Sequence, residues 1–156
     1  MDKAAQDVKY VGFWMRVLAT LIDTLVLSLV LSPLLSAITP ELDVDPARLA
    51  EDPVALEAAI DQVSRAMLLQ LPLFALAILL FWRWRSATPG KMLIGAVIAD
   101  AVTLQAPSVR QCLIRYLGYF ISAFPLLLGL IWVGFDSRKQ GWHDKLAGTV
   151  VIRKTA

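Results

Sequence analysis

Cysteine and histidine are nearly absent from this sequence, which contains one of each in 156 residues. A single cysteine, Cys112, excludes an intramolecular disulfide and a cysteine-based metal site, so we expect it to serve as a small helix-packing residue. The chain also lacks a phosphate-binding loop, metal-ligand spacing and a nucleophile–base arrangement. His143 and Asp144 are adjacent, and on a helix their side chains diverge by about 100°, so they form no dyad by themselves. The sequence therefore predicts no enzyme, no cofactor and no metal site.

A strong excess of either charge is missing as well. The formal net charge is only +2, and the basic residues flank apolar stretches instead of alternating with aromatics in one patch. This pattern predicts no binding of nucleic acid. No small-residue cleavage site follows the first apolar stretch, which is too long for the core of a signal peptide. We therefore expect that stretch to remain as a membrane span.

Apolar residues are abundant and grouped. They make up 58% of the chain, the mean hydropathy is +0.64, and three blocks stand out: Val17–Ser36, Met67–Trp82 and Tyr116–Phe135. A helix needs about 20 mostly apolar residues to cross a bilayer. The blocks predict an all-α integral membrane protein with two full spans and a third block that is either a broken hairpin or a kinked span.

The apolar stretch Gly12–Ser36, which contains the first block, carries two charges that are costly in lipid. Arg16 and Asp23 are two turns apart and within about 20° of each other around a helix. Arg16 can extend toward the headgroups as a simple anchor or form a specific ion pair. An ionisable residue inside a span, such as Asp23, often marks an ion pathway. This polar face must be covered by protein, headgroups or water.

An acidic loop at residues 39–65 follows the first block. By the positive-inside rule it faces away from the cytoplasm and the N-terminus faces inward, because its only bases are Arg48 and Arg65. Asp52-Pro53 is a good helix start, so we expect a helix from Pro53 into the second block. The acids are interpreted as a solvated face, with a cation site as the alternative. They are Glu41, Asp43, Asp45, Glu51, Asp52, Glu57 and Asp61.

Two short apolar runs, Met92–Asp100 and Gly148–Arg153, are too short to span a membrane. They are predicted to pair as a short two-stranded β ladder on the cytoplasmic side. The third block is interrupted by Pro125 and Gly129, and a break near Ala123–Gly129 would return the basic C-terminal tail to the cytoplasm. A single crossing, which would leave that tail outside, is the alternative.

Several motifs resemble the RDD family of bacterial inner-membrane proteins. They are Gly12–Arg16 with Leu21–Asp23, Thr88–Gly95, Phe135–Asp136 and His143–Val151, in the family's order. The resemblance implies a single RDD-type membrane domain over residues 1–156, located in the inner membrane. The family is named for an arginine and two aspartates, which match Arg16, Asp136 and Asp144, and Asp23 also fits the pattern. The resemblance implies transport or ion exchange only for some members.

The charged residues in or beside the apolar blocks nearly balance, which predicts a buried network or an ion site. Its candidates are Arg16, Asp23, Arg110, Arg115, Asp136 and Asp144. We expect Asp144 within about 4 Å of Arg16, and Asp23 in one buried network with Arg16 and at least one of Arg110 and Arg115.

Two functions fit such a network: a small-ion or proton-coupled transporter, and a membrane assembly or scaffold subunit in which the charges are structural. The expected partners are the bilayer, a small ion, and further copies of the chain or another membrane protein. Three apolar blocks are few for an alternating-access transporter, which favours a homo-oligomer. Small residues such as Gly118, Ser122 and Gly129 would let helices approach closely.

Overall fold

The computed structural model describes residues 8–38 and 46–153. Most of the N-terminal segment and the acids Glu41, Asp43 and Asp45 of the acidic loop lie outside the described residues. The chain forms two compact units, one of residues 1–26 with 77–156 and one of residues 27–76. Each is considered by itself.

Two long helices confirm the predicted spans. α1 runs from Phe13 to Ile38 and α3 from Pro53 to Arg85. Phe13–Leu34 and Pro53–Leu93 are long and apolar enough to cross a membrane, and the second stretch includes the short helix α4, Pro89–Leu93. α3 stays helical on both sides of Pro72.

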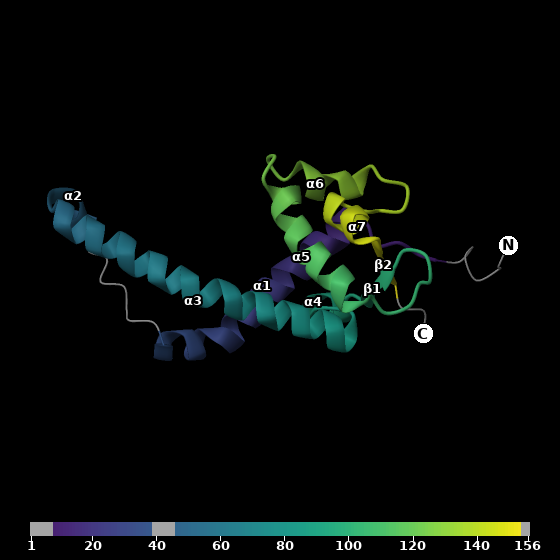
Figure 1. Ribbon diagram of the computed structural model, residues 1–156, viewed down its shortest axis with the longest axis horizontal. Coiled ribbons are helices and arrows are strands. Elements are labelled where there is room, and N and C mark those ends of the chain that lie inside the picture. Colours follow the sequence, from purple (N-terminus) through teal and green to yellow (C-terminus); the bar gives the residue numbers. More distant parts are fainter. Residues whose placement is uncertain (1–7, 39–45, 154–156) are drawn as a thin grey trace. The chain divides into compact units, whose positions relative to one another are not determined.

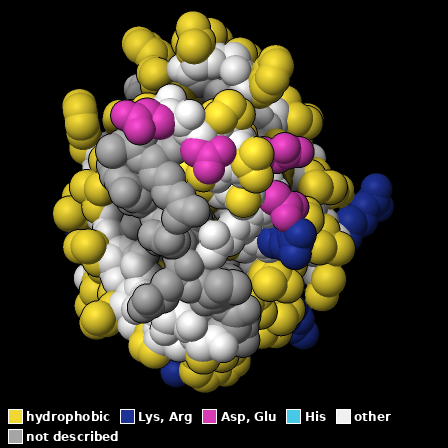
Figure 2. All heavy atoms as spheres, turned by 90° about the vertical axis from the view of Figure 1, so that its left-hand side faces the viewer, with side chains coloured by type: hydrophobic (Ala, Val, Ile, Leu, Met, Phe, Trp, Pro, Cys, Tyr) yellow, Lys and Arg dark blue, Asp and Glu magenta, His cyan; other side chains and the backbone are white. Residues whose placement is uncertain are grey.

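The unit of residues 27–76 contains the short helix α2, Pro46–Glu51, and the first part of α3. An Asp52 carboxylate oxygen accepts a hydrogen bond from the Val54 backbone nitrogen at 2.9 Å, which confirms the predicted helix start at Pro53. Glu51, Glu57 and Asp61 are exposed, and acidic side chains are visible among apolar ones at this end (Figure 2). Among the described residues no group of three or more His, Cys, Asp or Glu could hold a metal ion. The exposure of Glu51, Glu57 and Asp61 agrees with the interpretation of the acids as a solvated face.

The third apolar block is broken where the sequence predicts it. α5, Val109–Ala123, is followed by α6, Leu128–Ile131, and the 3-10 turn η2, Trp132–Gly134. The two parts are bent by 114°. Pro125 lacks a backbone donor to continue α5, and Leu126 and Leu127 adopt positive φ angles of 52° and 62° at the break.

The chain then returns along α5. The short helix α7, Trp142–Ala147, packs against α5 (Figure 1). At the start of α5, Ser108 accepts from the Gln111 backbone nitrogen at 3.2 Å while the Gln111 side chain accepts from the Ser108 backbone nitrogen at 2.9 Å. This capping box satisfies backbone donors at the first turn and marks the start of α5.

The predicted ladder is present. β1, Ala96–Asp100, pairs antiparallel with β2, Thr149–Arg153, and Ile98 lies opposite Val151. β1 is shorter than the predicted run, because its first residues belong to α4 and to a turn at Gly95 with φ 68°. Tyr10 bridges to Ile152, so the start of the described chain lies beside its end.

The hydrophobic core of the larger unit, residues 1–26 with 77–156, lies between the ladder, the end of α3 and the start of α5. Its buried members include Val11, Trp82, Ile98, Cys112 and Val151. Cys112 is thus a buried packing residue, as expected. Because the ladder ties the end of the chain to the segment before α5, α7 is held against the side of α5.

Candidate functional site

Asp144 lies at the third position of α7 and is completely buried. Its position follows from the start of that helix, where Gly141 is the N-cap and donates its backbone N–H to Asp144 Oδ2 at 2.9 Å. A carboxylate near a helix N-terminus accepts otherwise unpaired amides and is favoured by the helix dipole. Local sequence therefore fixes the direction of this side chain.

Two arginines bind this carboxylate. Arg16 of α1 donates from Nη1 to Asp144 Oδ2 at 2.6 Å, and Arg115 of α5 forms an ion pair with Oδ1. Arg16 also donates from Nε to the Val11 carbonyl at 3.0 Å and from Nη2 to the Lys139 carbonyl at 2.5 Å. The predicted contact between Arg16 and Asp144 is confirmed. We call Arg16, Asp144 and Arg115 the arginine staple, because it joins α1, α5 and α7.

Arg115 is buried, and Asp144 is the carboxylate with which it forms an ion pair among the described residues. It donates to the Thr149 hydroxyl at 2.7 Å, and its guanidinium carbon lies 5.4 Å from the ring centre of Trp82 and 5.8 Å from that of Tyr119. Facing rings attract a cation through their quadrupoles. This environment keeps the Arg115 side chain in one place.

The charges of α7 are set by their surroundings. Burial alone would raise the pKa of Asp144, but the charges of Arg115 and Arg16 outweigh it and hold the pKa well below its usual value. Burial, aided by the same arginines and Lys91, lowers the pKa of His143 from 6.5 to about 3. At neutral pH Asp144 is therefore ionised and His143 is neutral.

Asp23 lies apart from the staple, and the prediction that it pairs with an arginine is wrong. Its carboxylate accepts from the Gly90 backbone nitrogen at 2.6 Å and from the Thr88 hydroxyl. The Thr88 hydroxyl in turn accepts from Lys91 Nζ at 3.2 Å. Asp144 binds both Arg16 and Arg115. The hydrogen bonds of Asp23 are therefore supplied by the segment at the start of α4 instead.

Close approach of α4 to α1 depends on Gly90. A Cβ at this position would lie 2.1 Å from the Ala19 carbonyl oxygen and 3.0 Å from the Asp23 side chain. Only glycine permits that distance. The Thr88–Lys91 segment was recognised in the sequence as part of a family motif, but nothing in it identified Thr88 and Lys91 as partners of Asp23.

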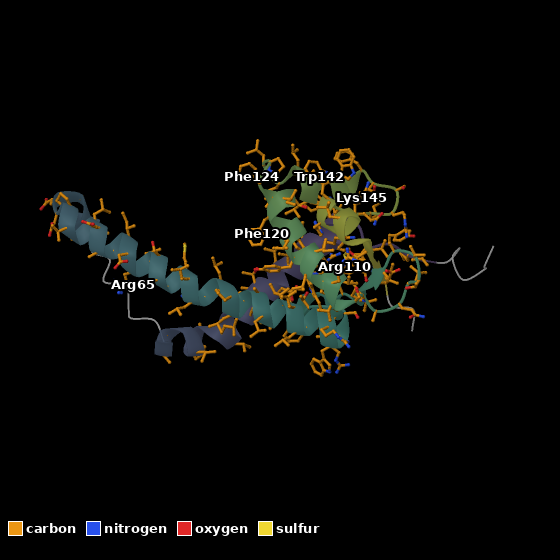
Figure 3. All side chains as sticks on the ribbon, viewed as in Figure 1. Arg65, Arg110, Phe120, Phe124, Trp142 and Lys145 are labelled. Atoms are coloured by element: carbon orange, nitrogen blue, oxygen red, sulfur yellow. The ribbon has the colours of Figure 1, made fainter. Side chains whose placement is uncertain are left out.

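Asp136 and Arg110 do not join the predicted network. Asp136 pairs with Lys145 and accepts from the backbone nitrogens of Arg138 and Gln140, both at 3.1 Å. Arg110 is exposed at the start of α5 (Figure 3) and makes no ion pair within the described part of the chain. It lies five positions before Arg115, which places the two on different faces of the helix.

A pocket of about 370 Å³ lies beside these groups. It is lined by residues of α1, α4, α5 and α7 and of the segment around α6. Its polar lining consists of Arg16, Thr20, Lys91, Tyr119 and His143. Its apolar lining consists of Phe13, Val17, Leu21, Leu127, Leu130 and Ile131. Sequence reasoning did not find this pocket, because its walls come from five separate segments.

Two comparisons with known proteins match this chain. The model of the RDD family matches residues 10–148. The uncharacterized protein RP437 of Rickettsia prowazekii (strain Madrid E) is 42% identical over 73 residues, which are 47% of this chain and 40% of that protein. The matched segment thus spans less than half of that relative. No solved structure matches.

Proposed function

Because the chain belongs to the RDD family over nearly its whole length, we propose that it is a multi-pass protein of the bacterial inner membrane that moves a small ion coupled to a proton. Asp23, Thr88 and Lys91, which we call the relay, would carry the proton. That the chain is a membrane protein of this family is supported by the family match and by the long apolar helices. Transport is the part that requires experiment.

One observation carries this proposal: an acid, a hydroxyl and an amine are bonded in sequence at the edge of a pocket. Thr88 donates to Asp23 and accepts from Lys91, and Lys91 lines the pocket. Lys91 is 7% exposed and has no carboxylate within 4.0 Å among the described residues. A hydroxyl between two titratable groups can pass a proton between them, and ionisable residues at membrane depth mark such paths.

The arginine staple has the opposite character. Both oxygens of Asp144 are bound by arginines, and a backbone amide adds a further donor. Protonating this acid would leave the buried Arg115 and the partly buried Arg16 without their partner, which is costly. We therefore assign the staple a structural role and place the exchange chemistry in the relay.

Proteoliposomes test the assignment. We expect purified protein, given an outward gradient of Na⁺, K⁺ or Cl⁻, to change the internal pH reported by an enclosed dye. Asp23→Asn and Lys91→Gln should each slow that change at least tenfold. Asp61→Asn and Arg110→Gln are matched controls, since they remove exposed charges outside the relay, and they should leave the rate unchanged.

The second candidate function is a scaffold or assembly subunit, favoured by the closed geometry of the staple. If reconstituted wild-type protein moves none of these ions, or if the relay variants move them at the wild-type rate, the transport proposal fails. Co-purification of a stoichiometric second membrane protein would then support the scaffold.

We also propose self-association in the membrane, because a chain with three apolar blocks is small for a transporter. Cross-linking in native membranes should give a dimer or higher species. A single monomer band at every cross-linker concentration would contradict this.

A further inference from the structure

The pocket beside the relay contains hydrogen-bonding groups, two of them cationic, that are not fully used by the protein. Lys91 carries three N–H donors and bonds only to Thr88 among the described residues. His143 is 2% exposed, and its Nε2 lies 3.5 Å from Asp144 Oδ2 but makes no hydrogen bond in the part of the chain that the structure describes. Arg16 lines the pocket together with Lys91 and His143. These side chains leave room for a polar group that is not part of the protein.

The charge at this end of the pocket is unbalanced. The cations near it are Arg16, Lys91 and Arg115, whereas the acids are Asp23 and Asp144, and neither acid lines the pocket. With His143 neutral, one positive charge is in excess. A ligand with a single negative charge would neutralise it, and such pairing is favoured where water is scarce.

The other end of the pocket is apolar and exposed. Leu21, Leu127 and Ile131 line it and are 58%, 52% and 40% exposed. They lie on α1 and the broken third block, which are apolar enough to meet lipid. Along α1 the lining runs from Phe13 at the start of the span, past Arg16, to Leu21, nearer its middle. An amphiphile with its head at the start of the span and its chain toward the middle has the same orientation as a lipid in the bilayer.

We propose that this pocket binds a long-chain fatty acid, with its carboxylate at Lys91, Arg16 and His143 and its chain leaving past Leu21 into the bilayer. A single carboxylate matches the single excess charge. The volume of about 370 Å³ is near the lower end of ligand pockets, about 300–1,000 Å³, and favours one chain over two. The inference goes beyond the proposed function, because binding is measured without any transport.

The test uses the full chain in nanodiscs and equilibrium binding of radiolabelled palmitate. Leu21→Trp should fill the mouth of the pocket and weaken binding at least tenfold. Leu25→Trp is the matched control: it lies one turn further along α1, is 72% exposed and does not line the pocket, so its affinity should equal that of the wild type. Equal affinities of the two variants would overturn the location.

Competition tests the headgroup. Unlabelled palmitate should displace the label at least tenfold more effectively than hexadecanol, which has the same chain without the charge, and Lys91→Met should abolish that preference. Equal competition by hexadecanol in the wild type would refute recognition of the carboxylate. Stronger competition by dipalmitoyl phosphatidic acid would assign the pocket to a two-chain phosphate lipid instead. If Lys91→Met fails to fold, the wild-type competition and the tryptophan pair still decide.

Discussion

Asp144 joins three segments that are far apart in the sequence. Its two oxygens bind Arg16 and Arg115, and the Gly141 backbone nitrogen completes its shell. A buried carboxylate with this many donors is stable as the anion, since each donor offsets part of the lost hydration. At the scale of single residues, the fold of the larger unit depends on this acid more than on any exposed charge.

Replacing Arg16 by lysine tests the geometry of the staple. Arg16→Lys keeps the charge but cannot donate at once to Val11, Lys139 and Asp144, so we expect a loss of about 2–3 kcal/mol in the free energy of unfolding. The readout is thermal unfolding in detergent. Arg110→Lys, at an exposed position, should change stability by less than about 0.5 kcal/mol. Equal effects of the two changes would argue against the staple.

His143 predicts how stability depends on pH. Its pKa falls from 6.5 to about 3 on folding because it is buried beside Arg115, Arg16 and Lys91. Below pH 6.5 the unfolded chain therefore binds a proton that the folded chain refuses, and stability declines as the pH falls from about 6.5 toward 3. Between pH 7 and 5 the loss should be about 2 kcal/mol, at about 1.4 kcal/mol for each pH unit below 6.5.

The control for this effect is straightforward, because the chain has no other histidine. His143→Gln should unfold at temperatures that no longer fall between pH 7 and 5. The pKa of Asp144 is lowered below its usual range, so this acid takes up a proton only at still lower pH. A wild-type unfolding temperature that is constant between pH 7 and 5 would show that His143 is protonated in the folded state.

Among the elements, α5 and the returning segment form the contact that positions the staple. One face of α5 meets the chain that comes back from the break. Its contacts run in order: Ser122 to Gly129 and His143, Gly118 to His143, Arg115 to Asp144, and Gln111 to Gly148. Residue numbers fall along α5 as they rise along the returning segment, so the segment runs antiparallel to α5.

Gly129 tests this contact. A Cβ there would lie 2.6 Å from Ser122 Cα and 3.0 Å from the Trp142 ring, so Gly129→Ala must push α6 away from α5. Overpacking of this kind costs about 1–3 kcal/mol. Gly134→Ala is the matched control, because a Cβ at that position has no atom within 4 Å. Its unfolding temperature in detergent should equal or exceed that of the wild type, whereas a tolerated Gly129→Ala would contradict the close packing.

For the whole molecule, the ladder places the start and end of the described chain side by side. The bridge between Tyr10 and Ile152 and the hydrogen bond from Val11 to Val151 at 2.9 Å make this contact. We therefore propose that both ends lie on the same side of a membrane. The positive-inside rule, applied to the basic residues of the tail and to the acidic loop, favours the cytoplasmic side.

Cysteine labelling checks the orientation. In a Cys112→Ala background, Lys9→Cys and Arg153→Cys, both at exposed positions, should react with a membrane-impermeant maleimide only after the cells are opened. Glu51→Cys should react in intact cells. Labelling of Arg153→Cys from outside would overturn the proposed sidedness.

The sequence by itself determined the elements and their ends. Runs of apolar residues predicted α1 and α3, and Asp52-Pro53 predicted the start of α3. Pro125 and Gly129 predicted the break in the third block, and two short apolar runs predicted the ladder. These signals are local, since they depend on the backbone preferences and polarity of neighbouring residues. The prediction that Asp144 binds Arg16 succeeded because the returning hairpin follows from that same break.

Only the tertiary structure decided which polar groups meet. Asp23 and Asp144 are both acids beside apolar blocks, yet one binds Thr88 and Gly90 and the other binds two arginines. The difference depends on how closely α4 approaches α1 at Gly90, a matter of a few ångströms that no spacing in the sequence encodes. The pocket has the same origin, because its cationic end and its apolar mouth are formed by segments that meet only after the chain has folded.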